Sequence, residues 1–519
     1  MQNFRQAIRG AIFGVAMLAL PAPAVAADAP AGTGTIWPTR QWQTSTHEEQ
    51  GMDSAALARL VDYGQTRNLD SLLIVRHGRI VLDAYYALYT AEIPHAVNSV
   101  TKAVTGTLTA IALKEGLIDK TSHPMLDYFG DRSIDNLDDR KKAITVQHLL
   151  DMTSGIAWTE PLTENRFESV IEMERSPDWV KFILDRPMAA APGETFNYNT
   201  GNSQLLSAIL AKVSGTSAED YAKAKLFGPL GITQWQWGRD PQGVTTGGFR
   251  LALLPRDMAK LGYLYLQRGE WDGVPLIAPE WTDKVNNATV NMNTPFNPAL
   301  RYSNQFWAMP NRQVYWANGY RCQTIAVYPP LDIVAVTTAH GDCNFSKLAG
   351  YVAGAVKSAT ALPPNPAAAS QLENTLREIA IEKPTERGNP SPLAAAISGK
   401  TYHFQRNGLS VKSLSLTLDG SEPRYDLEFY SRDPRNLASK FGGPIGLDGL
   451  YRRDKATDAG VSAIKGKWLN HHAFEIERLF VGGSGGPQKW TLYFDGDTLN
   501  LRGRSFDGRE IMVDGALGG

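Results

Sequence analysis

The sequence predicts an α+β domain followed by a C-terminal all-β module. Strand-like apolar runs pair into hairpins near both ends of the first 360 residues, and helical spacing dominates between them. From about residue 394 onward, short alternating strands are separated by Asp-Gly turns, which is typical of an all-β unit. A chain of 519 residues is too long for one ordinary core, so two or more domains are expected.

The N-terminus has the three parts of a secretory signal peptide. Arg5 and Arg9 give it a positive start, and residues 11–20 are apolar but too short to span a bilayer as a mature helix. A cleavage site of the A-x-A type follows at residues 24–26. We therefore expect residues 1–26 to be removed and the mature protein to be periplasmic or secreted. No later segment is apolar over a membrane-spanning length, so no stable membrane insertion is expected.

The main domain is expected at residues 51–360. It begins with a hairpin at residues 72–87 and ends with a hairpin around residues 329–330, which an amphipathic helix follows. Between these hairpins, apolar residues at helical spacing predict helices at residues 99–116 and 255–267.

The remaining boundaries follow from composition. A lead-in rich in Pro, Gly and Thr occupies residues 27–50. A Pro/Ala-rich stretch and a second Pro-containing break indicate a linker at residues 361–393. The all-β module then takes residues 394–519.

The charge balance excludes some classes of partner. A formal net charge of −1 and a pI of about 6.8 give no support for binding to nucleic acid or to an anionic membrane surface. The expected partner is a small molecule, and nothing indicates the oligomeric state. His471 and His472 lie between strand-like runs without a third ligand in view, so a surface turn is favoured over a metal site. No metal or cofactor is predicted.

Cys322 and Cys343 are the only cysteines of the chain. They flank the second hairpin, and an oxidising compartment permits a disulfide across or just beyond it. Two separate thiols are the other interpretation. Neither cysteine lies in a ligand-spaced cluster, so a metal-binding or catalytic cysteine is not indicated.

Ser99 and Lys102 allow two interpretations. Ser99 can cap a helix while Lys102 is solvated, and the Ser-x-x-Lys pattern arises by chance in most long proteins. Alternatively, residues three apart share one helix face, so the lysine can meet the serine hydroxyl and help to remove its proton. The helix N-terminus would then favour an oxyanion beside the serine. The rest of the chain decides between the two.

Five stretches occur in one order: NSVTKAVTG, ITVQHLLDMTSGIAW, PGETFNYNTGNSQLL, LLPRDMAKLGYLYLQRGEWDG and GYRCQTIAVYPPLDIVAV. Together they resemble the class C β-lactamase-related branch of the serine β-lactamase and penicillin-binding-protein superfamily. That branch includes esterases, D-amino-acid peptidases and 6-aminohexanoate-dimer hydrolases, and the resemblance covers roughly residues 72–360. It implies a β-lactamase-like fold, in which an antiparallel sheet flanked by helices is joined to a helical subdomain, with the site between them.

The resemblance assigns three catalytic residues. Its Ser-x-x-Lys motif makes Ser99 the nucleophile and Lys102 the residue that activates it. Its Tyr-x-Asn motif maps the tyrosine onto Tyr198. A phenol beside Lys102 can be held partly deprotonated and can relay the serine proton to the leaving group. Thr200 replaces the asparagine of this motif and offers only a hydroxyl, which argues against typical β-lactam recognition.

The superfamily's third motif, Lys-Thr-Gly or His-x-Gly on an edge strand, is best matched by Ala317-Asn318-Gly319. A glycine without a side chain lets the strand approach a substrate closely. The oxyanion hole would then use the backbone N–H groups of Ser99 and Tyr320.

The expected substrate is uncharged near this strand. Ala317 offers no cation to a substrate carboxylate, and only Arg250 or Arg321, the nearest arginines in sequence to these motifs, could replace it. Aromatic residues near the strand are expected to wall the pocket around an apolar acyl group. They are Tyr302, Phe306, Trp307, Trp316 and Tyr320.

These features predict a secreted serine hydrolase that cleaves an ester or amide bond through an acyl-enzyme on Ser99. A β-lactamase or a D-amino-acid peptidase is the alternative that uses the same chemistry. A non-catalytic binding protein, similar to penicillin sensors, is the alternative without chemistry. The presence of both Lys102 and Tyr198 favours the enzyme.

Overall fold

The computed structural model describes residues 35–162, 166–295, 297–430, 440–455, 460–483, 485–504 and 509–518. The predicted signal peptide and the first part of the predicted lead-in lie outside these residues. The last part of the lead-in packs against the main domain, where the Trp37 ring lies 5.9 Å from Tyr263 and 5.5 Å from Trp271 between centroids. This part of the lead-in therefore contributes to the main domain.

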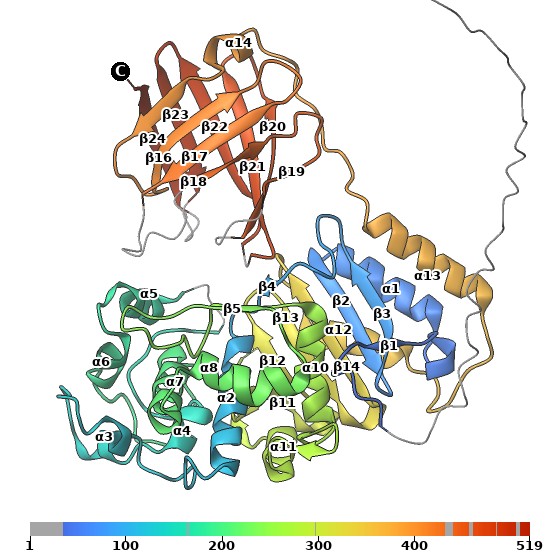
Figure 1. The fold of residues 1–519 in the computed structure, drawn as a ribbon, viewed down its shortest axis with the longest axis vertical. Coiled ribbons are helices and arrows are strands. Elements are labelled where there is room, and N and C mark those ends of the chain that lie inside the picture. The colour runs from blue at the N-terminus through green and yellow to red at the C-terminus, as the bar shows by residue number, and fades with distance from the viewer. Residues whose placement is uncertain are drawn as a thin grey trace, which may run out of the picture. The chain divides into compact units, whose positions relative to one another are not determined.

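A nine-stranded sheet forms the centre of the main domain, with the strand order β1-β3-β2-β14-β13-β12-β11-β10-β9 (Figure 1). Neighbouring strands are antiparallel, except for β1, which is parallel to β3. Both predicted hairpins are present, as β2–β3 and β13–β14. The strands are β1 (Gln43–Thr44), β2 (Leu69–Arg76), β3 (Arg79–Tyr85), β9 (Val290–Asn291), β10 (Arg301–Ser303), β11 (Phe306–Met309), β12 (Val314–Gly319), β13 (Gln323–Tyr328) and β14 (Ile333–Ala339).

Helices cover both faces of this sheet because the central strands are buried on both sides. Helices α2 (Val100–Lys114) and α10 (Pro255–Leu266) share one apolar core with residues such as Ile325 and Val334. Helices α1 (Ser54–Gln65) and α12 (Phe345–Ala355) share the core of the other face with residues such as Ile74 and Ala335. The predicted helices at residues 99–116 and 255–267 correspond to α2 and α10.

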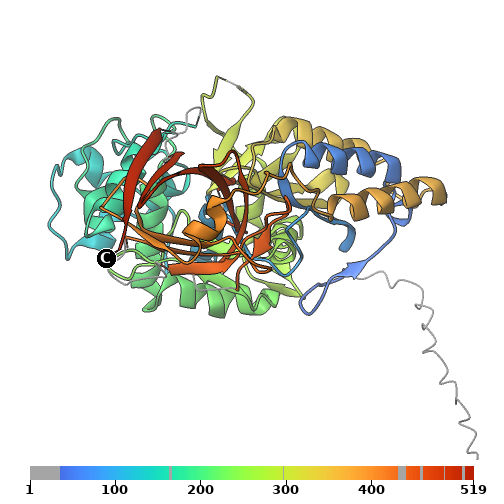
Figure 2. The ribbon, with the colours of Figure 1, turned by 90° about the horizontal axis from the view of Figure 1, so that it is seen from above.

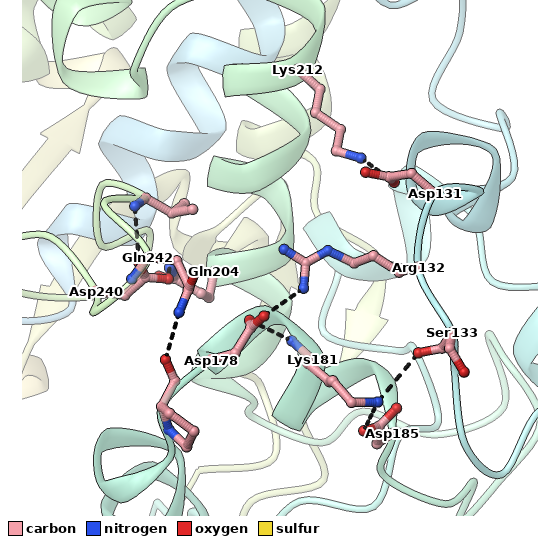
Figure 3. Close-up of polar contacts among 12 residues, drawn as sticks. Asp131, Arg132, Ser133, Asp178, Lys181, Asp185, Gln204, Lys212, Asp240 and Gln242 are labelled. Atoms are coloured by element: carbon pink, nitrogen blue, oxygen red, sulfur yellow. Dashed lines mark hydrogen bonds and ion pairs between the residues drawn. The ribbon is translucent and has the colours of Figure 1, made fainter.

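A helical subdomain packs against α2 on the side away from the sheet (Figure 1). Its most buried helix is α7, which contacts α2, α4, α6 and α8. Ion pairs tie its outer loops to its helices: Lys212 reaches Asp131 at 2.6 Å and Arg132 reaches Asp178 at 2.9 Å (Figure 3). The helices are α3 (Asp139–Lys142), α4 (Val146–Leu150), α5 (Glu168–Arg175), α6 (Trp179–Leu184), α7 (Thr200–Ser214), α8 (Ala218–Ala222) and α9 (Gly228–Leu230).

Two small sheets and helix α11 also belong to the main domain. A three-stranded sheet has the order β4-β6-β5, and its strand β4 ends three residues before Ser99 in the sequence. A two-stranded pair lies after α10, and α11 follows it. The elements are β4 (His95–Ala96), β5 (Trp235–Trp237), β6 (Leu251–Leu253), β7 (Glu270–Trp271), β8 (Val274–Pro275) and α11 (Pro279–Asn286).

Among its described residues, the C-terminal module is all-β except for the short helix α14 (Leu393–Ile397). Its ten strands form one sheet that curves around its own apolar core (Figures 1 and 2). The strand order is β18-β17-β16-β15-β24-β23-β22-β21-β20-β19. The strands are β15 (Thr401–Phe404), β16 (Val411–Thr417), β17 (Arg424–Phe429), β18 (Lys440–Pro444), β19 (Arg452–Arg453), β20 (Val461–Trp468), β21 (Ala473–Val481), β22 (Gln488–Asp495), β23 (Thr498–Arg504) and β24 (Glu510–Leu517).

Part of the predicted linker is a helix. Helix α13 (Pro366–Ile379) lies within residues 361–393 and packs on α1. The side chain of Asn365 caps it, and Leu372 and Ile379 are buried in the α1–α12 core. Because these two residues are seven apart, they share one helix face and anchor the segment to the main domain.

The two cysteines form a disulfide, with the Cα atoms of Cys322 and Cys343 5.7 Å apart. It joins the start of β13 to the segment after β14. This is one of the two interpretations that the predicted hairpin allowed. No helix among the described residues is long and apolar enough to cross a membrane. His471 and His472 are exposed in the turn between β20 and β21.

Candidate active site

Ser99 lies at the turn that leads into α2. Asn98 has a φ of 50°, in the left-handed region, and Ser99 follows with a φ of −70° and a ψ of −4°. Asparagine enters this region more readily than most residues because its short side chain can form local hydrogen bonds. The Ser99 side chain makes no capping hydrogen bond to α2. The hydroxyl therefore does not act as the N-cap that the sequence allowed.

Lys102 extends from the first turn of α2 toward Ser99. It is 1% exposed, and its Nζ donates to Ser99 Oγ at 3.0 Å and to the Gly248 carbonyl at 3.1 Å. Burial lowers the pKa of Lys102 to about 8, and the negative charge of Glu160 opposes that shift. A lysine with a pKa in this range can exchange a proton with the adjacent hydroxyl near neutral pH.

Tyr198 is the third predicted catalytic residue, and the structure places it beside the other two. Its ring centroid lies 4.9 Å from Lys102 Nζ and 6.3 Å from the Trp307 ring. Burial raises the pKa of Tyr198 well above its ordinary value, Glu160 raises it further, and a hydrogen bond with Ser99 opposes the shift. The phenol is therefore neutral. This argues against the expected partly deprotonated phenol, because burial and the charge of Glu160 both disfavour the phenolate.

A buried polar network fixes the carbonyl that holds Lys102. The Gly247 N–H donates to Gln204 Oε1 at 2.9 Å, and Gln204 Nε2 donates to Asp240 at 3.1 Å (Figure 3). The next residue, Gly248, has little room for a side chain, since a Cβ there would lie 2.9 Å from Thr200 Cγ2 and 3.3 Å from Lys102 Nζ. The loop can approach the lysine closely because this position is glycine.

Ser99 and Tyr320 present backbone N–H groups from two segments that meet. A Cβ on Gly319, at the end of β12, would lie 2.4 Å from the Val97 carbonyl, so the strand end approaches the Ser99 segment closely. Asn98 Nδ2 donates to the Tyr320 carbonyl at 3.0 Å and fastens the two segments together. Within the described part of the chain, neither of the two N–H groups donates to a protein acceptor. Such donors suit an oxyanion hole.

Ala317 and Asn318 precede Gly319 on β12 and have different surroundings. Ala317 is fully buried and lines a small interior cavity with Val100 and Ala103 of α2. Asn318 is half-buried. The structure therefore places Ala317 in the core between α2 and the sheet and does not bring it to a substrate-facing position.

Thr200 and Trp307 lie around Tyr198. Thr200 is 2% exposed, and its hydroxyl donates to Glu160 Oε1 at 2.7 Å while its N–H donates to Glu160 Oε2 at 2.9 Å. The hydroxyl is thus engaged within the protein. Trp307 is buried, and its ring centroid lies 6.1 Å from that of Trp316. It packs against the Tyr198 phenol as part of the core.

The two arginines considered as substrate anchors already have partners. Arg250 forms an ion pair with Glu174 at 2.6 Å. Arg321 donates to the His340 carbonyl at 3.0 Å, and its guanidinium lies 5.4 Å from the centroid of the Tyr320 ring. A substrate carboxylate would have to displace one of these contacts to recruit either arginine.

Three residues that the sequence did not single out contact the predicted ones. Asn98 holds the Tyr320 carbonyl, Gly248 holds Lys102, and Glu160 holds Thr200. The position of Asn98 directly before the proposed nucleophile was an available signal. Glu160 and Gly248 lie in other segments, and no motif in the sequence points to them.

Comparison with known proteins gives a consistent result. The beta-lactamase family profile matches residues 48–353, which is more than half of the chain. The 6-aminohexanoate-dimer hydrolase of Paenarthrobacter ureafaciens is 24% identical over 267 residues, which cover 47% of this chain and 65% of the relative. The monacolin J acid methylbutanoyltransferase of Aspergillus terreus is 24% identical over 155 residues, which cover 27% of this chain and 37% of the relative. The chain thus spans less than two thirds of the length of each.

Among solved structures, the octameric penicillin-binding protein homologue from Pyrococcus abyssi aligns with a TM-score of 0.46 at 19% identity, covering 88% of this chain and 99% of that chain. The family profile includes the segments that carry Ser99, Lys102, Tyr198 and Tyr320. On the match of that profile over most of the main domain, the chain belongs to the beta-lactamase family.

Proposed function

We propose that the protein is a secreted serine hydrolase that cleaves an ester or amide bond in a small molecule. The observation that carries this proposal is the 3.0 Å distance between Lys102 Nζ and Ser99 Oγ, at a buried site that lowers the pKa of the lysine to about 8. One curated relative is by name a hydrolase and another is by name a methylbutanoyltransferase, which supports chemistry at an acyl carbonyl. The expected signal peptide supports secretion or a periplasmic location.

In the proposed reaction, Ser99 Oγ attacks the substrate carbonyl and its proton passes to neutral Lys102. The oxygen of the carbonyl becomes negative and accepts hydrogen bonds from the N–H groups of Ser99 and Tyr320. The neutral phenol of Tyr198 donates its proton to the departing alcohol or amine and regains one from Lys102. A water molecule then attacks the acyl-enzyme by the same steps in reverse, which releases the acid and restores Ser99.

A fluorophosphonate probe tests the proposed nucleophile. We expect wild type to be labelled at Ser99, as located by peptide mass spectrometry, and Ser99→Ala to remain unlabelled while it keeps the wild-type melting temperature. Loss of a nucleophile lowers turnover by several orders of magnitude. Ser99→Ala retaining more than about a tenth of the activity would remove Ser99 from the mechanism.

A substrate panel then identifies the bond that is cleaved. It contains p-nitrophenyl esters, D-alanyl amides, linear amide oligomers and nitrocefin. Labelling of Ser99 without turnover of any of the four classes would favour a binding protein of the sensor type. Efficient nitrocefin turnover would identify a β-lactamase instead of an esterase or amidase.

A further inference from the structure

Glu160 is a buried carboxylate that is hydrogen-bonded to Thr200, two residues after Tyr198. It is 7% exposed and comes between α4 and α5, far from the catalytic residues in sequence. Its Oε2 accepts from Trp158 Nε1 at 2.7 Å and from the Thr200 N–H at 2.9 Å, and its Oε1 accepts from Thr200 Oγ1 at 2.7 Å. Among the described residues, no lysine or arginine forms an ion pair with it. Hydrogen bonds from neutral groups therefore hold its charge in the interior.

These hydrogen bonds attach the Glu160 segment to the loop that carries Tyr198. Thr200 is the first residue of α7 and follows Tyr198 by two positions. On the other side of Tyr198, Asn197 Nδ2 donates to the Trp158 carbonyl at 3.1 Å. The phenol thus lies between two points at which its loop is tied to residues 158–160.

The charge of Glu160 also acts on the proton-transfer residues. Ser99, Tyr198 and the Gly248 carbonyl lie around Lys102, and Glu160 is the charged side chain that acts on it. Glu160 opposes the fall in the pKa of Lys102 and adds to the rise in the pKa of Tyr198. When Lys102 receives the Ser99 proton, the new ammonium lies in the field of a negative charge that is already in place.

Two other buried titratable groups, Tyr302 and Asp151, do not supply a second negative charge to Lys102. Tyr302 is fully buried, and its pKa is raised well above the ordinary value, so it is neutral. Asp151 has a pKa that burial raises, while the nearby Lys284 opposes the rise. Its carboxylate accepts from the Asn304 N–H at 3.0 Å and from Gln147.

We propose that Glu160 is a positioning residue that holds the Tyr198 loop and supplies the negative charge that stabilises the Lys102 ammonium during acyl transfer. This inference rests on the proposed function. It adds a fourth side chain to the reaction, one that acts through Lys102 and Tyr198 and does not touch the substrate.

The test separates charge from packing. Glu160→Gln has the same shape: its amide oxygen can accept from Trp158 and from the Thr200 N–H, and its amide nitrogen can donate to the Thr200 hydroxyl. It removes the charge and reverses the hydrogen bond with the Thr200 hydroxyl, without changing its partners. Thr200→Val keeps the charge and removes the hydroxyl donor. Glu194→Gln is the matched control, because Glu194 is an exposed carboxylate on the same loop as Tyr198.

The readout is the pH dependence of kcat/KM for an ester that wild type hydrolyses. We expect Glu160→Gln to move the acidic limb to lower pH by on the order of 1 unit, because Lys102 loses its stabilising charge. Its kcat at the plateau should fall about tenfold or more. Thr200→Val should not move the limb downward, and Glu194→Gln should match wild type in both limb and plateau.

An unshifted limb in Glu160→Gln, with reduced activity, would overturn the proposal and leave Glu160 a purely structural residue. If Glu160→Gln does not fold, Thr200→Val decides: a downward shift there would show that packing, not charge, sets the limb. Glu160→Asp, which keeps the charge, should retain the wild-type limb. Failure of the proposed function is distinct from these outcomes, since wild type would then show neither labelling nor turnover.

Discussion

The Asn98 side chain donates to the Tyr320 carbonyl across 3.0 Å, and this bond joins the turn before the nucleophile to the end of β12. The two N–H groups proposed for the oxyanion hole come from these two segments. The separation of these N–H groups therefore depends on the side chain of Asn98, a residue whose backbone is in the left-handed conformation. A rigid separation matters because oxyanion stabilisation requires donors aimed at the place where charge develops.

Asn98→Gly should lower kcat about tenfold and leave KM nearly unchanged, because it removes the bond but tolerates the positive φ. Asn98→Ala should be at least as slow, since it adds backbone strain to the same loss. Asn293 is the control: it also has a positive φ, of 51°, and is exposed. Steady-state kinetics of the three variants check this. A kcat for Asn98→Gly equal to that of Asn293→Gly would show that the bond does not matter.

The pH dependence of the reaction follows from Lys102. Its pKa is lowered from the ordinary value to about 8, and the proposed mechanism needs the neutral amine. The protonated form dominates below that pKa, so kcat/KM should rise with pH through about 8 and level off above it. Stopped-flow labelling with the fluorophosphonate over a range of pH should show the same limb. A plateau that extends down to about pH 6 would exclude neutral Lys102 as the required form.

Lys102 and Tyr198 are expected to act as one unit. Lys102→Ala and Tyr198→Phe should each lower kcat by about 10³-fold or more, and the double variant should be little slower than either. The reason is that both serve one proton transfer, so removing either already breaks it. A double-mutant cycle measures the coupling. Losses that multiply would show two independent roles.

The sequence predicted the contacts among the candidate catalytic residues better than it predicted their surroundings. Ser99 and Lys102 are three apart on one helix, so their contact follows from helix geometry alone. Glu160 lies 40 residues from Thr200, and only the folded chain brings its carboxylate to the α7 N-terminus. The neutral state of Tyr198 likewise could not be predicted from the sequence, because it depends on how completely the phenol is buried.

The fold was predicted where periodicity is strong and missed where composition is ambiguous. The hairpins and the α2 and α10 helices follow from alternating and helical apolar patterns. The sequence predicts a linker where α13 lies, because proline and alanine dominate the start of this helix. Proline is tolerated in a first helical turn, and the burial of Leu372 and Ile379 against the main domain supplies the stability that such a segment lacks alone.

Gly482, directly after β21, is hydrogen-bonded to the segment before Ser99. Its carbonyl accepts from the Ala96 N–H at 2.7 Å, and a Cβ there would lie 2.2 Å from the Pro94 carbonyl. Gly482→Ala should therefore lower kcat/KM and the melting temperature. Gly496→Ala is the control, because Gly496 also has a positive φ, of 57°, but has nothing within 4 Å of an added Cβ. Equal effects of the two substitutions would mean that backbone strain alone is responsible.

The charge of the substrate should affect the rate of turnover, because the described residues near β12 offer no free cation. Ala317 is buried and offers no cation, Arg250 is paired with Glu174, and Arg321 is held by the His340 carbonyl. A substrate carboxylate near this strand would lose its hydration without gaining a ready partner. We therefore expect a higher kcat/KM for uncharged esters or amides than for penicillins and cephalosporins.

A matched pair of substrates, one with a free carboxylate and the other with its methyl ester, measures this preference directly. The methyl ester should be the better substrate by about tenfold or more, the scale of one unpaired buried charge-assisted contact. A clear preference for the free acid would contradict the prediction. If that preference then disappeared in Arg250→Ala or Arg321→Ala, the arginine concerned would have left its present partner to bind the substrate.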